Sequence, residues 1–250
     1  MIVISVALDC EAKPFIKEYK LERIKAPFPI YKNDLLVLVV TGIKSYSMTA
    51  IGYVFGKFSI SSFINIGICG HKEKEVGTLV ACHKIECDDN AIYPSPYLSS
   101  KLKPIQLKTV ETVETTYPDD CVYDMEGYYV CFSASKFISI DQIICMKVVS
   151  DNLHTGIKQI TKPFVTSLMS TLIPELNPLI EKKDGGLGEL VPPNMKVRLS
   201  TTEKILLEKK LEKLLLLQSD SDLNFLETIS CKHLLFKTID QKLDRARLSF

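Results

Sequence analysis

Two carboxylates are placed where they could carry out acid–base chemistry. Glu126 lies in the run YDMEG at 123–127, near the start of a predicted helix. Asp151 follows the apolar run 143–149, which is typical of a strand buried on both faces. Ligands of open α/β sheets bind outside the carboxyl ends of the strands. Asp151 therefore occupies a position at which a catalytic acid can act.

A third carboxylate, Glu11, follows the first predicted strand, residues 2–8. A parallel sheet gathers the carboxyl ends of its strands on one edge, so these three acids are expected to lie together. The alternative is structural, because Asp124 and Asp151 are also suitable helix N-caps, which is the commoner task for such residues. The residues alone leave both interpretations open.

Strands and helices are expected to alternate along the first 180 residues, and this alternation predicts an α/β sheet. The predicted strands are 2–8, 35–40, 63–66, 76–82, 105–110 and 142–149. The predicted helices are 9–20, 46–58, one from about 124, and 158–181 with proline interruptions. Asp9 is expected to cap the first helix, with Pro14 in its first turn. Residues 84–104 are expected to form a surface loop.

Glycine-rich turns are predicted after two of these strands, at Thr41-Gly42 and at 67–70 (GICG). Glycine lets backbone N–H groups approach a ligand closely, because it has no Cβ. Neither turn has the spacing of a phosphate loop or of the dinucleotide fingerprint. Each is therefore a candidate ligand contact, with a purely steric role as the alternative.

Composition is that of an ordinary globular protein. The chain has 250 residues and a formal net charge of +1, which gives no electrostatic basis for binding nucleic acid or an anionic membrane. No run reaches the roughly 18 apolar residues of a membrane span, and the first residues resemble a buried strand more than a signal peptide. The eight cysteines form no CxxC pair and fit no common zinc spacing. We expect reduced thiols, a cytoplasmic location, no metal and no cofactor.

The composition changes near the Gly- and Pro-rich run 183–199, which is the clearest predicted linker. We expect an α/β domain over residues 1–182 and a helical segment over 200–250. A capping box at 200–203 precedes a leucine stripe at Leu206, Leu207, Leu211, Leu214 and Leu215. A second helical stretch is predicted at about 221–247.

Six short segments, in this order, resemble the nucleoside phosphorylase/nucleosidase superfamily, and particularly the methylthioadenosine/S-adenosylhomocysteine nucleosidases. They are ALDCE at 7–11, VTGI at 40–43, INIGICG at 64–70, VGTLV at 76–80, YDMEG at 123–127 and KVVSD at 147–151. The resemblance covers about residues 1–180. It implies a three-layer α/β fold with a central mixed sheet flanked by helices, to which the C-terminal helices are an addition.

The resemblance also implies roles for the three acids. Asp151 would protonate purine N7 as the glycosidic bond breaks, which burial favours by raising a carboxyl pKa. Glu126 would accept hydrogen bonds from the ribose hydroxyls, with Met125 packed on the sugar, and Glu11 would orient or deprotonate the attacking water. The other implied substrate-binding residues are Ser150, Gly42, Cys69 and Gly70.

The chain departs from the family at several positions. Family phosphorylases hold phosphate with arginines, whereas no arginine lies near these turns, and Lys44 or Lys147 would be an imperfect substitute because a lysine lacks the planar fork of arginine. The nucleosidases have arginine at Lys147 and serine at Ile68. The segment 105–123 is shorter than theirs and normally supplies an aromatic residue that stacks on the base, for which Tyr117 and Tyr93 are the candidates.

We therefore expect an N-ribosyl hydrolase that acts on a small-molecule purine nucleoside. A nucleoside phosphorylase is the nearest alternative, and a nucleoside-binding or scaffold protein without turnover is the alternative from another class. A homodimer is expected from the resemblance alone.

Overall fold

The structure, a computed structural model, describes residues 1–94, 102–155, 160–181, 197, 207, 210–211, 226 and 229–248. The chain forms two compact units, Met1–Ile180 and Glu181–Phe250. The predicted linker, 183–199, lies outside the described residues except for Val197. In the described part of the chain, no helix combines the length and apolar character that crossing a membrane requires.

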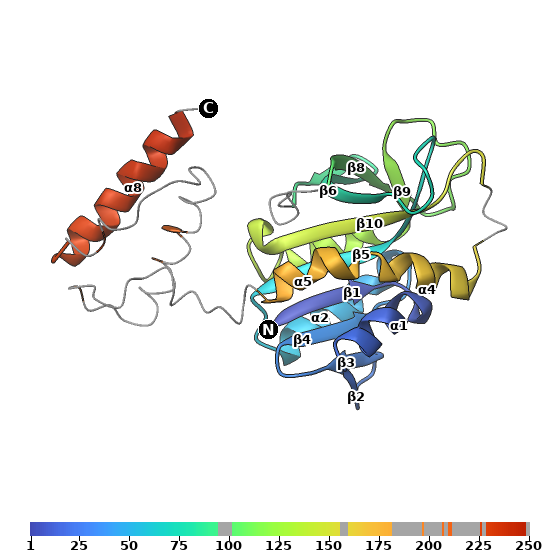
Figure 1. The fold of residues 1–250 in the computed structure, drawn as a ribbon, viewed down its shortest axis with the longest axis horizontal. Coiled ribbons are helices and arrows are strands. Elements are labelled where there is room, and N and C mark those ends of the chain that lie inside the picture. The colour runs from blue at the N-terminus through green and yellow to red at the C-terminus, as the bar shows by residue number, and fades with distance from the viewer. Residues whose placement is uncertain are drawn as a thin grey trace. The chain divides into compact units, whose positions relative to one another are not determined.

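The first unit is built from ten strands and five α-helices within its described residues (Figure 1). The strands are β1 (Ile2–Val6), β2 (Glu22–Ile24), β3 (Ile30–Lys32), β4 (Leu36–Val40), β5 (Ser62–His71), β6 (Leu79–Cys87), β7 (Asn90–Ile92), β8 (Pro104–Thr109), β9 (Val122–Asp124) and β10 (Ile143–Asp151). The helices are α1 (Asp9–Glu18), α2 (Ser47–Lys57), α3 (Gly127–Ala134), α4 (Lys162–Ser170) and α5 (Ile173–Glu181).

The strands pair into one mixed sheet. β1 lies between β4 and β5 and is parallel to both, and β10 continues the parallel order beyond β5. β3 adds to β4, and β2 to β3, in antiparallel orientation. On the other side the sheet curls into a closed ring, because β10 pairs with β6, β6 with β8, β8 with β9, and β9 with β5. The parallel strands β1, β5 and β10 bring their carboxyl ends to one edge.

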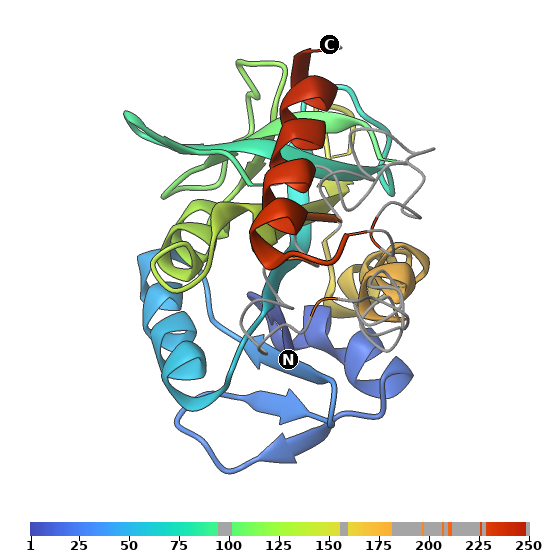
Figure 2. The same cartoon turned by 90° about the vertical axis from the view of Figure 1, so that its left-hand side faces the viewer.

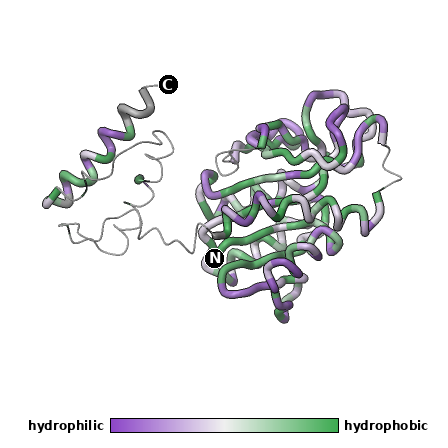
Figure 3. Tube along the Cα trace, viewed as in Figure 1, coloured by the Kyte–Doolittle hydropathy of each residue, from purple (hydrophilic) through white to green (hydrophobic). Residues whose placement is uncertain are grey.

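Helices cover both faces of the sheet, as Figure 2 shows. The alternating side chains of β1 divide between two cores: Ile2 and Ile4 pack with α1, α4 and α5, whereas Val3 packs with α2 and α3. Apolar runs follow the central strands (Figure 3), and β1, β4 and β10 are buried throughout. The predicted α/β fold with a mixed sheet between helices is thus confirmed.

The structure corrects several predicted boundaries. The predicted turn at 67–70 is wrong, because β5 runs through these residues to His71. The predicted loop 84–104 contains the end of β6 and all of β7. Pro14 lies in the middle of α1 rather than in its first turn. The carbonyl of Cys10, which a proline cannot satisfy, accepts a hydrogen bond of 2.8 Å from the Thr166 hydroxyl on α4.

The second unit contains α8 (Lys232–Leu248). Leu235, Ile239 and Leu243, spaced four residues apart, form the buried stripe of this helix. Their cluster includes Leu207 and Leu211, two members of the predicted leucine stripe. The other positions of that stripe lie outside the described residues.

Candidate active site

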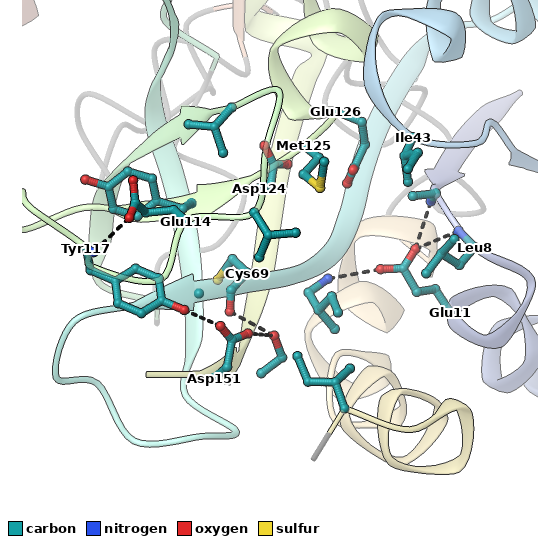
Figure 4. Close-up of a pocket in the computed structure, with 18 residues that line it drawn as sticks. Leu8, Glu11, Ile43, Cys69, Glu114, Tyr117, Asp124, Met125, Glu126 and Asp151 are labelled. Carbon is teal, nitrogen blue, oxygen red and sulfur yellow. Dashed lines mark hydrogen bonds between the residues drawn. The ribbon is translucent and has the colours of Figure 1, made fainter. Parts of the chain in front are cut away.

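A pocket of about 190 Å³ opens at the carboxyl ends of β1, β5 and β10 (Figure 4). All but one of the sequence-predicted site residues line it, namely Glu11, Cys69, Gly70, Met125, Glu126, Ser150 and Asp151. In Figure 4, Asp151 and Glu11 lie toward opposite ends of the pocket, with Cys69 on the side of Asp151. The edge of the parallel strands therefore gathers the three acids as expected.

Gly42 is the exception, since it is not among the residues that line the pocket. It has a φ of +77°, a conformation that favours glycine, and its N–H donates to the carbonyl of Ala7 over 3.1 Å. Its neighbour Ile43 lines the pocket instead. The glycine thus shapes the turn after β4, and the prediction that it binds substrate has no support in the geometry.

Asp151 is the last residue of β10, and both of its carboxylate oxygens accept hydrogen bonds. Oδ1 accepts from the Ser150 hydroxyl, and Oδ2 accepts from the Tyr117 hydroxyl. Ser150 Oγ also lies 3.2 Å from the carbonyl oxygen of Cys69 on β5. The pKa of Tyr117 is raised, mainly by burial and secondly by the hydrogen bond with Asp151. This phenol therefore stays protonated and acts as a donor.

Glu11 is fixed by backbone donors. Its Oε2 accepts from the N–H groups of Ala7 and Leu8 at 2.8 and 2.9 Å, and its Oε1 accepts from the N–H of Ile68 at 3.1 Å. Burial raises the pKa of Glu11, which Lys147 and these N–H donors oppose without cancelling. Glu11 is therefore a rigidly held carboxylate with a raised affinity for a proton, which is what a general base requires.

Lys147 forms the centre of a buried ionic cluster beneath the pocket. Its Nζ lies 2.7 Å from Asp124 Oδ2 and 3.4 Å from Glu126 Oε1, and its side chain is fully buried. Burial lowers the pKa of Lys147, but Asp124 and Glu126 raise it by more, so the residue remains a cation. Because the ammonium group of Lys147 already pairs with Asp124 and Glu126, it is not available to hold a phosphate.

Asp124 contacts both the start of α3 and the buried Lys147. Its Oδ2 accepts from the N–H of Gly127, the first residue of α3, over 2.9 Å, and the same oxygen pairs with Lys147. Its Oδ1 accepts from the Thr109 hydroxyl over 2.7 Å. The N-cap of α3 is Glu126 rather than Asp124, but the bond from Gly127 lets Asp124 anchor the start of this helix.

The cluster contains more carboxylates than cations. Glu126 is buried, and burial, together with Asp124 and Glu11, raises its pKa to about 8 against the opposing charge of Lys147. None of the described residues that line the pocket is a lysine or an arginine. Across the described part of the chain, no three His, Cys, Asp or Glu side chains group as metal ligands would, and the eight cysteines are free thiols.

The raised pKa of Glu126 gives a prediction for stability. The folded chain holds this proton up to about pH 8, whereas the unfolded chain releases it near the ordinary 4.5. The free energy of unfolding should therefore fall between these values, by up to about 1.4 kcal/mol per pH unit. Glu126→Gln cannot titrate and should flatten this fall, although Glu11, whose pKa is raised in the same direction, retains part of it.

Urea unfolding of the parent and of Glu126→Gln between pH 5 and pH 8.5 measures the effect. The exposed Glu22 on β2 supplies the control, since Glu22→Gln should keep the slope of the parent. Equal slopes for the parent and Glu126→Gln would show that Glu126 is already ionised in the folded chain at pH 5.

Solved structures that match the fold of the chain include nucleosidases. The 5′-methylthioadenosine/S-adenosylhomocysteine nucleosidase of Campylobacter jejuni matches with a TM-score of 0.63 and 18% identity, over 72% of this chain and 98% of that chain. The apo 5′-methylthioadenosine nucleosidase of Arabidopsis thaliana matches with a TM-score of 0.62 and 17% identity, over 74% and 96%. The chain has the nucleoside phosphorylase/nucleosidase fold.

A futalosine hydrolase mutant of Helicobacter pylori strain 26695 shares the nucleosidase fold, with a TM-score of 0.63 and 15% identity over 72% of this chain and 98% of that chain. No protein-family model matches the sequence, and no curated protein matches it. The resemblance deduced from the six segments is confirmed at the level of the fold. Identities this low establish the fold and not the substrate.

Within the nucleosidase fold, the segment 110–121 supplies side chains to which sequence reasoning gave no position. Tyr117 is buried against Asp151, and Val113 and Glu114 also line the pocket. Tyr93, the other candidate for a stacking residue, is exposed and is not among the lining residues. The shortness of the segment and the two candidate tyrosines, of which only Tyr117 lies within it, were the available signals, and only three-dimensional contacts select Tyr117.

Gly67 on β5 shows why glycine occurs inside a strand here. A Cβ at this position would lie 3.1 Å from Lys147 Nζ and 3.2 Å from Glu11 Oε1. Because neighbouring groups hold both atoms in place, Gly67→Ala is expected to lower the free energy of unfolding by about 1–3 kcal/mol. Urea unfolding measures the loss.

Gly52 in α2 is the matched control, because nothing lies within 4 Å of a Cβ built there. Gly52→Ala should stabilise the helix by about 0.5–1 kcal/mol. An unchanged stability for Gly67→Ala would mean that the ionic cluster has room to relax around a methyl group.

Proposed function

We propose that the chain is an N-ribosyl hydrolase that cleaves the glycosidic bond of a purine nucleoside of the methylthioadenosine/S-adenosylhomocysteine type. The observation that carries the proposal is the division of one pocket between two carboxylates with different surroundings. Asp151 has hydroxyl donors on both oxygens, whereas Glu11 is held by backbone N–H groups at the other end. Glu126, whose pKa is raised to about 8, lines the same pocket.

In this proposal Asp151 delivers a proton to N7 of the base as the bond between C1′ and N9 breaks, and the bonding electrons leave with the base. Glu126, once it has released its proton, accepts hydrogen bonds from the ribose hydroxyls and stabilises the positive charge that develops on the sugar, while Met125 packs on the ring. Water then bonds to C1′ and transfers a proton to Glu11. The surplus of carboxylates around the pocket suits a transition state that gains positive charge.

The charge of the pocket favours water over phosphate as the nucleophile. Its lining residues include the carboxylates of Glu11, Glu114, Asp124, Glu126 and Asp151, and no lysine or arginine among the described residues. Lys44 contacts Glu111 at 4.0 Å and is not a lining residue. A phosphate dianion would therefore meet acidic side chains without a compensating cation. We accordingly place phosphorolysis second to hydrolysis.

Product analysis tests this proposal. The parent chain is incubated with methylthioadenosine, S-adenosylhomocysteine, adenosine and inosine, each with and without inorganic phosphate, and free base is measured by chromatography. We expect base release that does not depend on phosphate. Release only in the presence of phosphate would instead identify a phosphorylase.

A nucleoside-binding protein without turnover is the second candidate. The observation in its favour is that the Tyr117 hydroxyl is hydrogen-bonded to Asp151, the proposed acid, and so competes with a substrate for it. Nucleoside binding measured by calorimetry, with no base released from any substrate of the panel, would support this candidate and refute the hydrolase.

We also propose that the chain forms a homodimer in the cytoplasm. Leu8, Ile43 and Val113 are exposed hydrophobic residues that line the pocket, and a second copy would cover them. Light scattering should give twice the chain mass of 28.2 kDa. A monomer at micromolar concentration would contradict the dimer and leave the chemistry of the pocket unaffected.

A further inference from the structure

Tyr117 fills the space beside the proposed acid. Its side chain is almost fully buried, and its hydroxyl donates to Asp151 Oδ2 (Figure 4). The ring packs against the backbone of Gly70, where a Cβ would lie only 2.6 Å from Tyr117 Cε1. On its other side the ring is tilted against Tyr123, with centroids 5.7 Å apart. Glycine at position 70 is therefore what lets a planar ring reach Asp151.

The turn that carries Tyr117, residues 114–117, is held by its own contacts, whereas its flanks bond outside it, Glu111 to Tyr129 and Asp119 to Lys108. The Glu114 carboxylate accepts from the N–H groups of Thr115, Thr116 and Tyr117 at 2.9, 2.7 and 3.3 Å. Tyr117 itself has a φ of +45°, a strained conformation for a residue with a Cβ. Because the bonds to Glu114 lie within the turn, they can survive its displacement, whereas the bond from Tyr117 to Asp151 cannot.

The pocket is too small for a nucleoside while the phenol is in this position. Its volume of about 190 Å³ is below the roughly 300–1,000 Å³ of pockets that bury small ligands. The two oxygens of Asp151 are already engaged by Tyr117 and Ser150. A leaving base can reach this carboxylate only after the phenol moves.

We propose that Tyr117 is a specificity-determining residue whose phenol occupies the leaving-group position until a planar base displaces it from Asp151. The inference rests on the proposed function only in taking Asp151 as the group that meets the base. It assigns to this position ligands that share two features of the phenol, an aromatic ring and an edge that donates a hydrogen bond to a carboxylate. Sugars without a base do not displace it.

Adenine is the probe, because its binding requires no turnover. Calorimetry compares the parent with Tyr117→Phe, which keeps the ring and removes the hydroxyl. Since a hydrogen bond to a charged group contributes about 1.5–3 kcal/mol, Tyr117→Phe is expected to bind adenine roughly ten- to a hundredfold more tightly than the parent. Tyr53→Phe is the matched control, because its hydroxyl accepts from Lys57 on α2 and is not part of the pocket.

Unchanged or weaker adenine binding by Tyr117→Phe would overturn the proposal, and so would a lack of adenine binding by both proteins. Amide hydrogen exchange on the parent gives a second readout that needs no variant. Adenine should increase exchange over residues 110–121, whereas increased protection there would contradict displacement. If adenine binding tightens but no nucleoside is cleaved, the hydrolase proposal fails and the role of Tyr117 stands.

Discussion

Asp151→Asn is expected to reduce the rate of base release by about 10²–10⁴-fold, while nucleoside binding changes by no more than a few-fold. The amide has the shape of the carboxyl group and can still accept from the Tyr117 hydroxyl, so the pocket should remain intact. It cannot deliver a proton to the leaving base. Measurement of kcat by base release, and of the Kd by calorimetry, separates the lost chemistry from lost binding.

Asp120→Asn is the control for this change. The Asp120 side chain is 96% exposed and lies 3.3 Å from His71 rather than in the pocket. It makes the same exchange of a carboxylate for an amide and should leave kcat at the value of the parent. Full activity of Asp151→Asn would show that Asp151 is not the general acid and that another carboxyl group, such as Glu126, protonates the base.

Lys147→Met is expected to have the largest effect on stability. It removes the buried cation that pairs with Asp124 and Glu126 and so leaves buried carboxylates without a counter-charge. Breaking a buried ion pair on one side typically costs about 3–5 kcal/mol, and we expect a loss of this size in the free energy of unfolding. Urea unfolding at pH 7 measures it.

An exposed lysine provides the comparison. Lys108 pairs with Asp119 at the surface of β8, and pairs of this kind contribute at most about 1 kcal/mol. Lys108→Met should therefore change the stability far less than Lys147→Met does. Similar losses for the two variants would mean that the cluster around Lys147 is hydrated enough to tolerate unpaired charge.

Much of the fold was predictable because local patterns decide it. The uninterrupted apolar runs that became β1, β4 and β10 are typical of strands buried on both faces, and the small and apolar residues of 46–58 became α2. The end of β5 was missed because glycine usually marks turns. Gly67 and Gly70 are instead needed inside the strand, where Lys147, Glu11 and Tyr117 approach it. That requirement arises from contacts between segments distant in the sequence.

The candidate site was predictable in part for the same reason. Glu11 and Asp151 follow strands whose parallel order was expected, so their meeting at one edge could be deduced. The two partners of Lys147, Asp124 and Glu126, could not be deduced. A lysine within an apolar run carries no information about which carboxylates will surround it. The position of Tyr117 depends on the path of a loop, and loop paths follow from tertiary contacts rather than from periodicity.

The central claim is that water opens the bond between the base and the sugar. The most direct test is to incubate the parent chain with methylthioadenosine in water enriched in ¹⁸O, without phosphate, and to weigh the sugar product by mass spectrometry. The account predicts release of adenine and a sugar that carries one ¹⁸O atom at C1′. Substrate that remains intact, or a sugar phosphate that forms only when phosphate is added, would contradict it.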